Sequence, residues 1–341
     1  MYPEQQEAAP AADVHLAPRP ARNATAATAT RHSRRGLAFK FGGSSLLGAD
    51  RMLHAAALVR DAAEASPVTV VVSAMKGVTD SLLEIATKLK RDELAKAREA
   101  AQNLVALHLG VLNGLQLPEQ DRVQVLHELK LLAHDLLHET PKRGPVIVAP
   151  ALFDRLASFG ERFSVRLFAA ALTKLGIVAV PVASSDFVLT CDTFRDAKPY
   201  LGQTRERGRA VLVPLLESGI VPVVTGFIGA TFDGRMTTLG RNSSDFSAAL
   251  IAYVVDAGEL VIWTDVDGVF TACPREIAEA KLFHELSYDE AHALAAGGAK
   301  VLHPRVLPLA AEHDMTVWVR NTFKPHLRGT RIGPAQNGGA A

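Results

Sequence analysis

The chain has 341 residues, of which 48% are hydrophobic and 21% are charged, and its formal net charge is +1. This length suffices for one large α/β core or two lobes, while the near-zero net charge and the lack of an apolar run of roughly 20 residues give no argument for nucleic-acid or membrane binding. Only two cysteines occur, so no disulfide framework is implied and a reducing, cytoplasmic setting is favoured.

Residues 1–35 differ in composition from the rest of the chain, because they are rich in Ala, Pro, Thr and Arg and nearly lack bulky apolar residues. Such a segment cannot bury a core, so we predict a disordered extension. The basic run Arg31–Arg35 leaves a cleaved targeting peptide as the alternative, whereas the missing apolar region excludes a secretory signal. Residues 334–341 are expected to form a flexible tail.

From residue 36 onward, short apolar runs alternate with longer segments of helical periodicity. The short runs are continuously apolar, which is typical of strands in a sheet covered on both faces. The expected strands are Leu37–Phe41, Val68–Val72, Ile177–Val182, Ile220–Val224, Leu260–Trp263 and Met315–Val319. The expected helices are Asp50–Glu64, Asp80–Lys90, Glu119–His138, Glu161–Leu175, Phe246–Val255 and Ala291–Ala296, the last after a Ser287–Glu290 capping box. The alternation predicts an α/β fold, a three-layer α/β/α sandwich with a mainly parallel central sheet.

The first candidate site is the segment from Lys40 to Ser45, in which a strand delivers a lysine before two glycines and two hydroxyl residues. Gly42 and Gly43 allow the backbone to approach a ligand closely, and Lys40 adds a mobile cation, so the composition favours a phosphate cradle. The lysine precedes the glycines, which distinguishes the segment from the Gly-x-x-x-x-Gly-Lys-Ser/Thr loop. The alternative is a turn between a strand and a helix with a surface lysine.

Two further segments combine a structural interpretation with a functional one. Ser73 to Asp80 forms a small-residue loop after the second expected strand, where ligands bind in α/β sheets. N-capping by Thr79 or Asp80 explains the same residues. Glu161 is expected at the start of a helix, where the helix dipole favours a carboxylate, so a cap-region role is the alternative to ligand binding.

The segment Thr237–Asp245 gives the strongest indication of a binding site. It lies between an apolar run and an apolar helical run, so it is expected to be a loop that leads into a helix. Arg241 and Asp245 are four residues apart, which on a helix would favour an ion pair, but the small and polar residues between them favour a loop. Arginine binds carboxylates and phosphates in a bidentate manner, and helix N-termini bind anions. We therefore predict a site for a charged substrate near a phosphate.

Two C-terminal segments are candidates for nucleotide contacts. Asp265 begins an Asp-Val-Asp-Gly segment, which is typical of a tight turn and is not part of a twelve-residue Ca²⁺ loop. The functional interpretation is that Asp265 contacts the ribose or an amine of a nucleotide and Arg275 contacts a phosphate. Lys300 follows two glycines, and a phosphate contact and a solvated lysine are equal alternatives for it. His303 has no partner at metal-ligand spacing and is predicted to be structural.

Taken together and in this order, these segments resemble aspartate kinases (aspartokinases) of the amino-acid kinase superfamily, over roughly residues 36–333. The matching segments are Lys-Phe-Gly-Gly-Ser-Ser, Val-Val-Ser-Ala-Met-Lys-Gly-Val-Thr, Gly-Glu, Thr-Leu-Gly-Arg-Asn-Ser-Ser-Asp, Trp-Thr-Asp-Val-Asp-Gly-Val-Phe-Thr-Ala-Cys-Pro-Arg and Gly-Ala-Lys-Val-Leu-His-Pro. The resemblance implies a carbamate kinase-like fold. It also implies phosphoryl transfer from MgATP to the β-carboxylate of L-aspartate, which gives 4-phospho-L-aspartate.

The resemblance further implies a role for each matching residue. Lys40 would contact the transferring phosphoryl group and the acceptor and would be held by Asp245, as the catalytic pair. Glu161 would bind the substrate ammonium and Arg241 its α-carboxylate. The other residues implied at the acceptor are Ser73, Thr79, Phe227 and Ser244. The residues implied at ATP are Gly42, Gly43, Ser44, Thr264, Asp265, Phe270, Arg275 and Lys300.

The same resemblance bears on cofactors, partners and domains. Mg²⁺ would be bound through ATP, with no metal ligands assigned in the chain. The resemblance also implies that the chain forms a homodimer. Residues 36–204 are expected to form an acceptor-binding N-lobe and residues 205–333 a nucleotide-binding C-lobe. The chain stops at Ala341, which leaves no room for the ACT domains that bind lysine or threonine in many aspartate kinases, so we expect no such feedback control.

Four positions depart from the family pattern. Asn242-Ser243 stands where the family has Gly-Gly, Phe270 replaces a tyrosine, Cys273 replaces an aspartate and Ser44 replaces a threonine. The first departure motivates a second hypothesis, a sibling kinase that acts on another acidic amino acid or related carboxylate. Phe270 and Cys273 motivate a third, a catalytically weak homologue that binds a ligand and regulates a partner.

Overall fold

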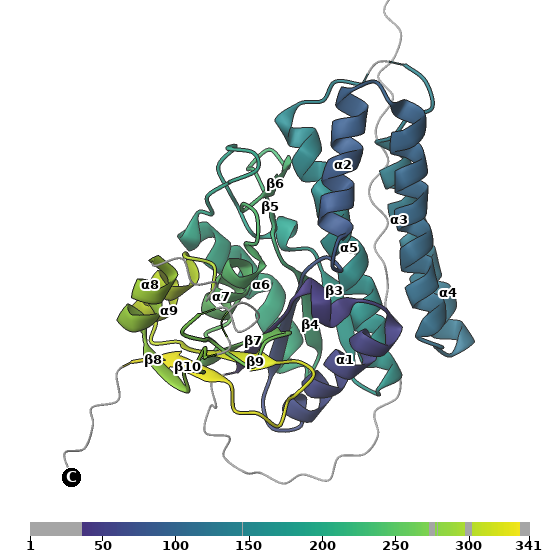
Figure 1. The fold of residues 1–341 in the computed structure, drawn as a ribbon. Helices are drawn as coiled ribbons and strands as arrows, with labels where there is room; N and C mark the ends of the chain where they lie inside the picture. Colours follow the sequence, from purple (N-terminus) through teal and green to yellow (C-terminus); the bar gives the residue numbers. More distant parts are fainter. Residues whose placement is uncertain (1–35, 145, 273–276, 278, 297–301, 335–341) are drawn as a thin grey trace, which may run out of the picture. The chain divides into compact units, whose positions relative to one another are not determined.

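An eight-stranded sheet organises the fold in a computed structural model that describes residues 36–144, 146–272, 277, 279–296 and 302–334 (Figure 1). Neighbouring strands are parallel except for one antiparallel pair, β9 with β10. The strand order is β3 (Ala179–Val182), β4 (Val221–Thr225), β2 (Val68–Val72), β1 (Leu37–Phe41), β7 (Glu259–Thr264), β9 (Thr316–Asn321), β10 (Thr330–Gly333) and β8 (Glu285–Ser287). The predicted, mainly parallel sheet is confirmed.

Four short strands were not predicted. β8 and β10 complete one edge of the large sheet, while β5 (Ile228–Ala230) and β6 (Met236–Thr238) form a separate antiparallel pair. Each has only three or four residues. A run of that length is too short to show a hydrophobic period.

Helices cover both faces of the large sheet, which gives the predicted three layers. One face contacts α1 (Ala49–Ala63) and α5 (Pro150–Lys174). The other face contacts α6 (Leu201–Glu217) and α7 (Ser244–Val254), and α7 in turn contacts α9 (Val306–Glu312), which packs on α8 (Tyr288–Ala296).

Successive residues of β2 show why both faces are apolar. Val70 and Val72 belong to the core shared with α1 and α5, whereas Val71 belongs to the core shared with α7. Side chains alternate between the faces of a strand, so a strand buried on both sides requires a continuous apolar run. The Val-Val-Val sequence of β2 meets this requirement.

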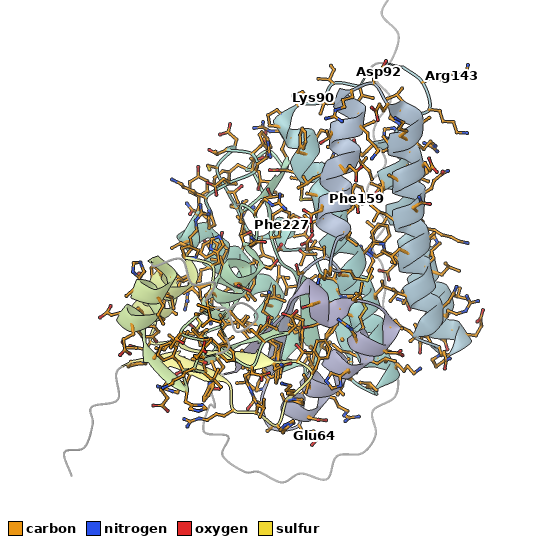
Figure 2. The ribbon with its side chains drawn as sticks, viewed as in Figure 1. Glu64, Lys90, Asp92, Arg143, Phe159 and Phe227 are labelled. Carbon is orange, nitrogen blue, oxygen red and sulfur yellow. The ribbon has the colours of Figure 1, made fainter. Side chains whose placement is uncertain are left out.

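Three helices form an additional layer outside α5: α2 (Val78–Lys90), α3 (Leu94–Gly114) and α4 (Glu119–His138) pack on one another and on α5 (Figure 1). Phe159 of α5, which is labelled in Figure 2, is 1% exposed in the same core. α3 and α6 were not predicted. Helix α4 has the predicted ends, Glu119 and His138, whereas the other predicted helices are present with shifted ends. The capping box is confirmed, because Ser287 N donates to Glu290 Oε2 at 2.7 Å.

The predicted start of α5 is wrong. The helix begins at Pro150, a residue well suited to the first helical position, so Glu161 lies in the middle of the helix rather than in its cap. Gly160 is helical as well, and a Cβ atom there would lie 2.5 Å from Ala74 Cβ. The glycine therefore allows α5 to pack directly against the loop after β2.

The carboxyl ends of the central strands are aligned, because Phe41 at the end of β1 is in register with Val72 of β2 and with Trp263 of β7. Val72 is in turn in register with Thr225 of β4. The loops that follow these strands therefore meet at one edge. Among the described helices, none is both long enough and apolar enough to cross a membrane. The predicted extension 1–35 and residues 335–341 lie outside the described residues, and the division into two lobes stays a prediction.

Candidate active site

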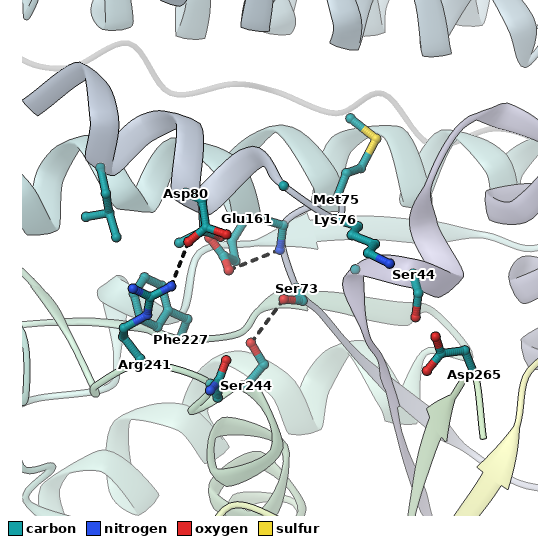
Figure 3. A pocket seen from close by; sticks show the side chains of 16 residues that line it. Ser44, Ser73, Met75, Lys76, Asp80, Glu161, Phe227, Arg241, Ser244 and Asp265 are labelled. Atoms are coloured by element: carbon teal, nitrogen blue, oxygen red, sulfur yellow. Dashed lines mark hydrogen bonds and ion pairs between the residues drawn. The ribbon is translucent and has the colours of Figure 1, made fainter. Parts of the chain in front are cut away.

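A pocket of about 340 Å³ lies where these loops meet (Figure 3). Its lining draws on the loops after β1, β2, β4 and β7, the start of α2, the middle of α5 and the segment before α7. The predicted site residues in this lining are Gly43, Ser44, Ser73, Thr79, Glu161, Phe227, Arg241, Ser244 and Asp265. The other predicted and described residues, which are outside the lining, are Lys40, Gly42, Asp245, Thr264 and Phe270.

Lys40 and Asp245 form an ion pair next to the pocket. Lys40 Nζ lies 2.7 Å from Asp245 Oδ1, and the two side chains are 12% and 19% exposed. Oδ1 receives no well-aligned hydrogen bond, so the contact is an electrostatic ion pair. The pair joins the centre of the sheet to the first turn of α7, and the Lys40 ammonium lies beside Gly42, where an added Cβ would be 3.3 Å from Nζ.

The glycine loop after β1 is packed against the loop after β2. A Cβ at Gly43 would lie 2.6 Å from Ala74 O and 2.8 Å from Lys76 N, so no side chain fits. Lys76 N donates to Gly43 O at 3.1 Å, and Ser73 N donates to Phe41 O at 3.2 Å. These contacts hold two predicted motifs in one wall of the pocket.

Glu161 presents a buried carboxyl group to the pocket. Its side chain is 1% exposed, Oε1 accepts a hydrogen bond from Ala74 N at 3.0 Å, and Oε2 has no partner among the described residues. Burial raises the pKa of Glu161 to about 8. In the absence of a ligand the group is therefore mostly protonated at neutral pH, and a cation bound at Oε2 would favour its ionised form.

Arg241 faces the same pocket but does not pair with Asp245. Its Nη2 lies 2.6 Å from Asp80 Oδ1, and both side chains are 71% exposed (Figure 3). The i, i+4 pairing that a helix would have allowed is thus absent, because the segment before α7 is a loop. Asp80 at the start of α2 was not predicted as a site residue.

Asn242, at a position where the family pattern has glycine, adopts a backbone conformation that glycine favours. Asn242 has φ 61° and Gly240, two residues earlier, has φ 97°, so both occupy the left-handed region. Asparagine is among the non-glycine residues that best tolerate this region. Ser243 follows as the N-cap residue of α7 and is 0% exposed, although its Oγ makes no hydrogen bond among the described residues.

Helix α7 positions two more residues that were predicted at the acceptor, Ser244 and Phe227. Ser244 Oγ donates to Ser73 Oγ at 3.3 Å, which links α7 to the loop after β2 (Figure 3). Phe227 has φ 68° and is 7% exposed, and its N donates to Ser247 Oγ at 2.7 Å. A left-handed conformation is unusual for a bulky residue and is found where surrounding structure enforces it, as at ligand sites.

The predicted nucleotide side is only partly described. Asp265 lines the pocket, Thr264 O accepts a hydrogen bond from Thr322 N at 2.8 Å, and Phe270 pairs with Leu282 in an isolated bridge. The turn after β7 is fixed by Asp267, which accepts a hydrogen bond from Lys324 Nζ at 2.9 Å. Arg275, Lys300 and Cys273 lie outside the described residues.

Two supporting residues were missed at the sequence level. Asp154 of α5 is 1% exposed and accepts hydrogen bonds from Thr238 N at 2.9 Å and Arg195 N at 2.8 Å, so it anchors the strand that leads into the Arg241 loop. No sequence pattern marks Asp154. Lys76 also lines the pocket; it lies within the predicted Ser73–Asp80 segment, which was the available signal.

His303 packs on Phe246 with ring centroids 5.9 Å apart, which agrees with the structural role predicted for it.

The chain is similar to known proteins and to a known family. Residues 37–321 match the model of the amino acid kinase family. The chain is 34% identical to the lysine-sensitive aspartokinase 3 of Escherichia coli (strain K12) over 86% of its own length and 63% of that protein. It is 33% identical to the chloroplastic aspartokinase 1 of Arabidopsis thaliana over 86% of its length and 51% of that protein.

Solved structures give a similar result. E. coli aspartokinase III in complex with aspartate and ADP superposes with a TM-score of 0.76 at 33% identity, covering 89% of this chain and 65% of that one. Clostridium acetobutylicum aspartate kinase has a TM-score of 0.69 at 19% identity, covering 89% of this chain and 63% of that one, a likeness of fold alone. The chain therefore spans about half to two thirds of the length of these relatives.

Proposed function

The chain belongs to the amino acid kinase family, and we propose that it transfers the γ-phosphoryl group of ATP to the β-carboxylate of L-aspartate. One observation carries the proposal. A single pocket beside the Gly42–Gly43 loop holds a buried carboxyl group, Glu161, and a guanidinium, Arg241. The similarity to an E. coli enzyme solved with aspartate and ADP supports both ligands.

The two charged groups suit a zwitterionic amino acid. Glu161 Oε2 has no partner among the described residues and can accept a hydrogen bond from the substrate ammonium. Arg241 can exchange its contact with Asp80 for the α-carboxylate, because a planar guanidinium binds carboxylates with two parallel hydrogen bonds. With these two groups bound, the side-chain carboxylate of aspartate remains available to extend towards the glycine loop.

The reaction requires positioning rather than proton transfer. A β-carboxylate oxygen forms a bond to the γ-phosphorus, the bond from that phosphorus to the β,γ-bridging oxygen breaks, and ADP leaves with the electron pair. The acceptor is already ionised at neutral pH, so no general base is needed. Lys40 would then neutralise charge on the phosphoryl oxygens from its position beside Gly42, held there by Asp245.

Mg²⁺ fits the site as a companion of the phosphates. The described residues contain no group of three or more His, Cys, Asp or Glu side chains that could hold a metal ion by themselves. Mg²⁺ in kinases uses one or two carboxylates together with substrate phosphates, and Asp265 supplies a carboxyl group to the lining. Bound in this way, the ion would supply further charge neutralisation. We assign Thr264, Phe270, Arg275 and Lys300 to the nucleotide by family resemblance.

One observation favours a second candidate. Asn242 is exposed and lines the pocket at a position where the family pattern has glycine. Its side chain reduces or reshapes the space near Arg241, which would suit a sibling kinase for another acidic amino acid. The departure bears on the acceptor and leaves the phosphoryl-transfer chemistry unchanged.

A hydroxamate assay distinguishes these functions. Hydroxylamine traps an acyl phosphate, so the purified chain is incubated with ATP, Mg²⁺, hydroxylamine and, in turn, L-aspartate, D-aspartate, L-glutamate and L-asparagine. Hydroxamate with L-aspartate alone supports the proposal, and hydroxamate with another acceptor supports the sibling kinase. No hydroxamate with any acceptor would contradict both.

A further inference from the structure

We propose that Lys76 binds the oxygens of the transferring γ-phosphoryl group, as a second protein cation beside Lys40. The inference rests on the proposed phosphoryl transfer and adds to it a residue for which the family pattern has no fixed identity. The Lys76 side chain lines the pocket (Figure 3).

The backbone of Lys76 is fixed by a turn. Val78 N donates to Met75 O at 3.0 Å, and Gly77 has φ 85° and ψ −17°, which are the dihedrals of the third residue of a type II turn. Met75 is 1% exposed and Val78 is 2% exposed, so the residues on both sides of the turn are anchored in the core. Lys76, between them, is exposed. The lysine is therefore presented outward by a rigid turn.

The turn lies against the glycine loop. Lys76 N donates to Gly43 O at 3.1 Å, and Gly43 has no space for a side chain because of this contact. The Lys76 side chain extends towards Ser44 in Figure 3. Lys40 approaches the same loop from β1, whereas Lys76 approaches it from the loop after β2. Two ammonium groups thus reach one candidate phosphate cradle from different strands.

The other two cations that the structure describes at or beside the pocket are already paired. Lys40 is paired with Asp245, and Arg241 is paired with Asp80. Lys76 makes no ion pair within the described residues. The described lining residues include two cations, Arg241 and Lys76, and because Arg241 is already paired, Lys76 is the one that can offer positive charge to a triphosphate. An unmatched ammonium at the glycine loop supplies that charge, and charge-assisted contacts of this type stabilise a phosphoryl group in transit.

The test compares Lys76→Met and Lys76→Arg with a matched control, Lys90→Met. Lys90 is an exposed lysine at the opposite end of α2, labelled in Figure 2. The thirteen residues of α2 place it about 20 Å from the turn. Binding of β,γ-imido-ATP and of ADP, each with Mg²⁺, is measured by calorimetry on the full chain. This readout does not depend on the identity of the acceptor.

We expect Lys76→Met to weaken β,γ-imido-ATP binding about tenfold and ADP binding less than twofold, because only the former has a γ-phosphoryl group. Lys76→Arg should restore most of the affinity, and Lys90→Met should match the wild type. In the hydroxamate assay, Lys76→Met should lower kcat about 10- to 100-fold, with a change in KM for aspartate below threefold.

Three results would overturn the inference. Equal effects of Lys76→Met on the two nucleotides, or no effect on either, would remove Lys76 from the γ-phosphoryl group. A rise in KM for aspartate with unchanged kcat would place Lys76 at the acceptor instead. A wild-type chain that binds β,γ-imido-ATP but forms no hydroxamate would contradict the proposed acceptor chemistry, and in that case the nucleotide comparison still decides the role of Lys76.

Discussion

Lys40 Nζ lies 2.7 Å from Asp245 Oδ1, and this contact joins the central strand β1 to the first turn of α7. The two residues are 205 positions apart in sequence, and each belongs to a different motif. Their pairing orients a flexible lysine beside the glycine loop, where a phosphoryl group would be transferred.

Loss of either member of this pair should lower turnover. Lys40→Ala should lower hydroxamate formation at least 100-fold, because removing one preorganised donor from a transition state costs about 10²–10³ in rate. Asp245→Asn should have a smaller effect, since Lys40 keeps its charge and loses only its anchor. Rates are measured at saturating aspartate and ATP. Lys96→Ala, at a 67% exposed side chain, is the control, and turnover retained by Lys40→Ala would remove Lys40 from the mechanism.

Glu161 should release a proton when aspartate binds. Its pKa is raised to about 8 by burial, so at pH 7 the free carboxyl group is protonated, and pairing with the substrate ammonium requires ionisation. Aspartate affinity should therefore rise as the pH increases from 6 to 8. Calorimetry in buffers of different ionisation enthalpy should detect about one proton released at pH 7. Glu161→Gln should abolish this release and weaken binding by roughly 2–5 kcal/mol.

The same carboxyl group should make the ligand-free protein less stable as the pH rises, whereas it makes aspartate binding tighter. The folded-state pKa of about 8 lies above the ordinary value of 4.5, so the folded state binds the extra proton between these values. The contribution of Glu161 to stability is therefore greatest below pH 4.5 and declines as the pH rises to about 8. In thermal unfolding from pH 5 to pH 8, the wild type should lose more stability than Glu161→Gln. Parallel Tm profiles for the two proteins would argue against the raised pKa.

Gly43 should tolerate no side chain. A Cβ at this position would lie 2.6 Å from Ala74 O and 2.8 Å from Lys76 N, both backbone atoms. Gly43→Ala should therefore separate the two loops and lower kcat/KM at least tenfold. Gly110→Ala in α3 meets no atom within 4 Å and should be neutral, or stabilising by about 0.5–1 kcal/mol. Both variants are compared with the wild type by steady-state kinetics and chemical unfolding. Full activity of Gly43→Ala would show that the close contact between the two loops is not needed.

Asn242 should be replaceable by glycine but not by valine. Its φ of 61° is left-handed, which a β-branched residue adopts only at a cost of about 1–2 kcal/mol. Asn242→Gly should keep the fold and the activity with aspartate, whereas Asn242→Val should lower both. Acceptor panels on the two variants also show whether the Asn242 side chain selects the acceptor. A gain of glutamate turnover in Asn242→Gly would mean that it does.

Several lining residues could be predicted from the sequence because they follow strands. Ser73, Asp265 and Gly43 occur directly after apolar runs, and parallel strands bring their carboxyl ends to one edge. Glu161 was placed in the right pocket by family resemblance, although its predicted position at a helix start was wrong. The helix runs without interruption from Pro150 through Gly160 to Lys174, so Gly160 does not mark a helix start.

The remaining site residues depend on tertiary contacts that no local pattern encodes. Asp80 is an acceptable helix-cap residue by sequence, and only the fold brings it within 2.6 Å of Arg241. Asp154 anchors Thr238 across 84 positions of sequence. Lys76 becomes distinctive only when the turn is seen against Gly43. Such residues act through neighbours distant in the chain, which is why their roles were not predicted, even though Lys76 and Asp80 lie within the predicted Ser73–Asp80 segment.

The most direct test of the proposed function follows an oxygen atom. L-Aspartate labelled with ¹⁸O in the β-carboxylate is incubated with ATP, Mg²⁺ and hydroxylamine, and the inorganic phosphate is analysed by mass spectrometry. Attack of the β-carboxylate on the γ-phosphorus leaves its oxygen in the bridge, and hydroxylamine then releases it with the phosphate. We predict one ¹⁸O atom in each phosphate formed with the hydroxamate. Unlabelled phosphate, as ATP hydrolysis by water would give, would contradict the account.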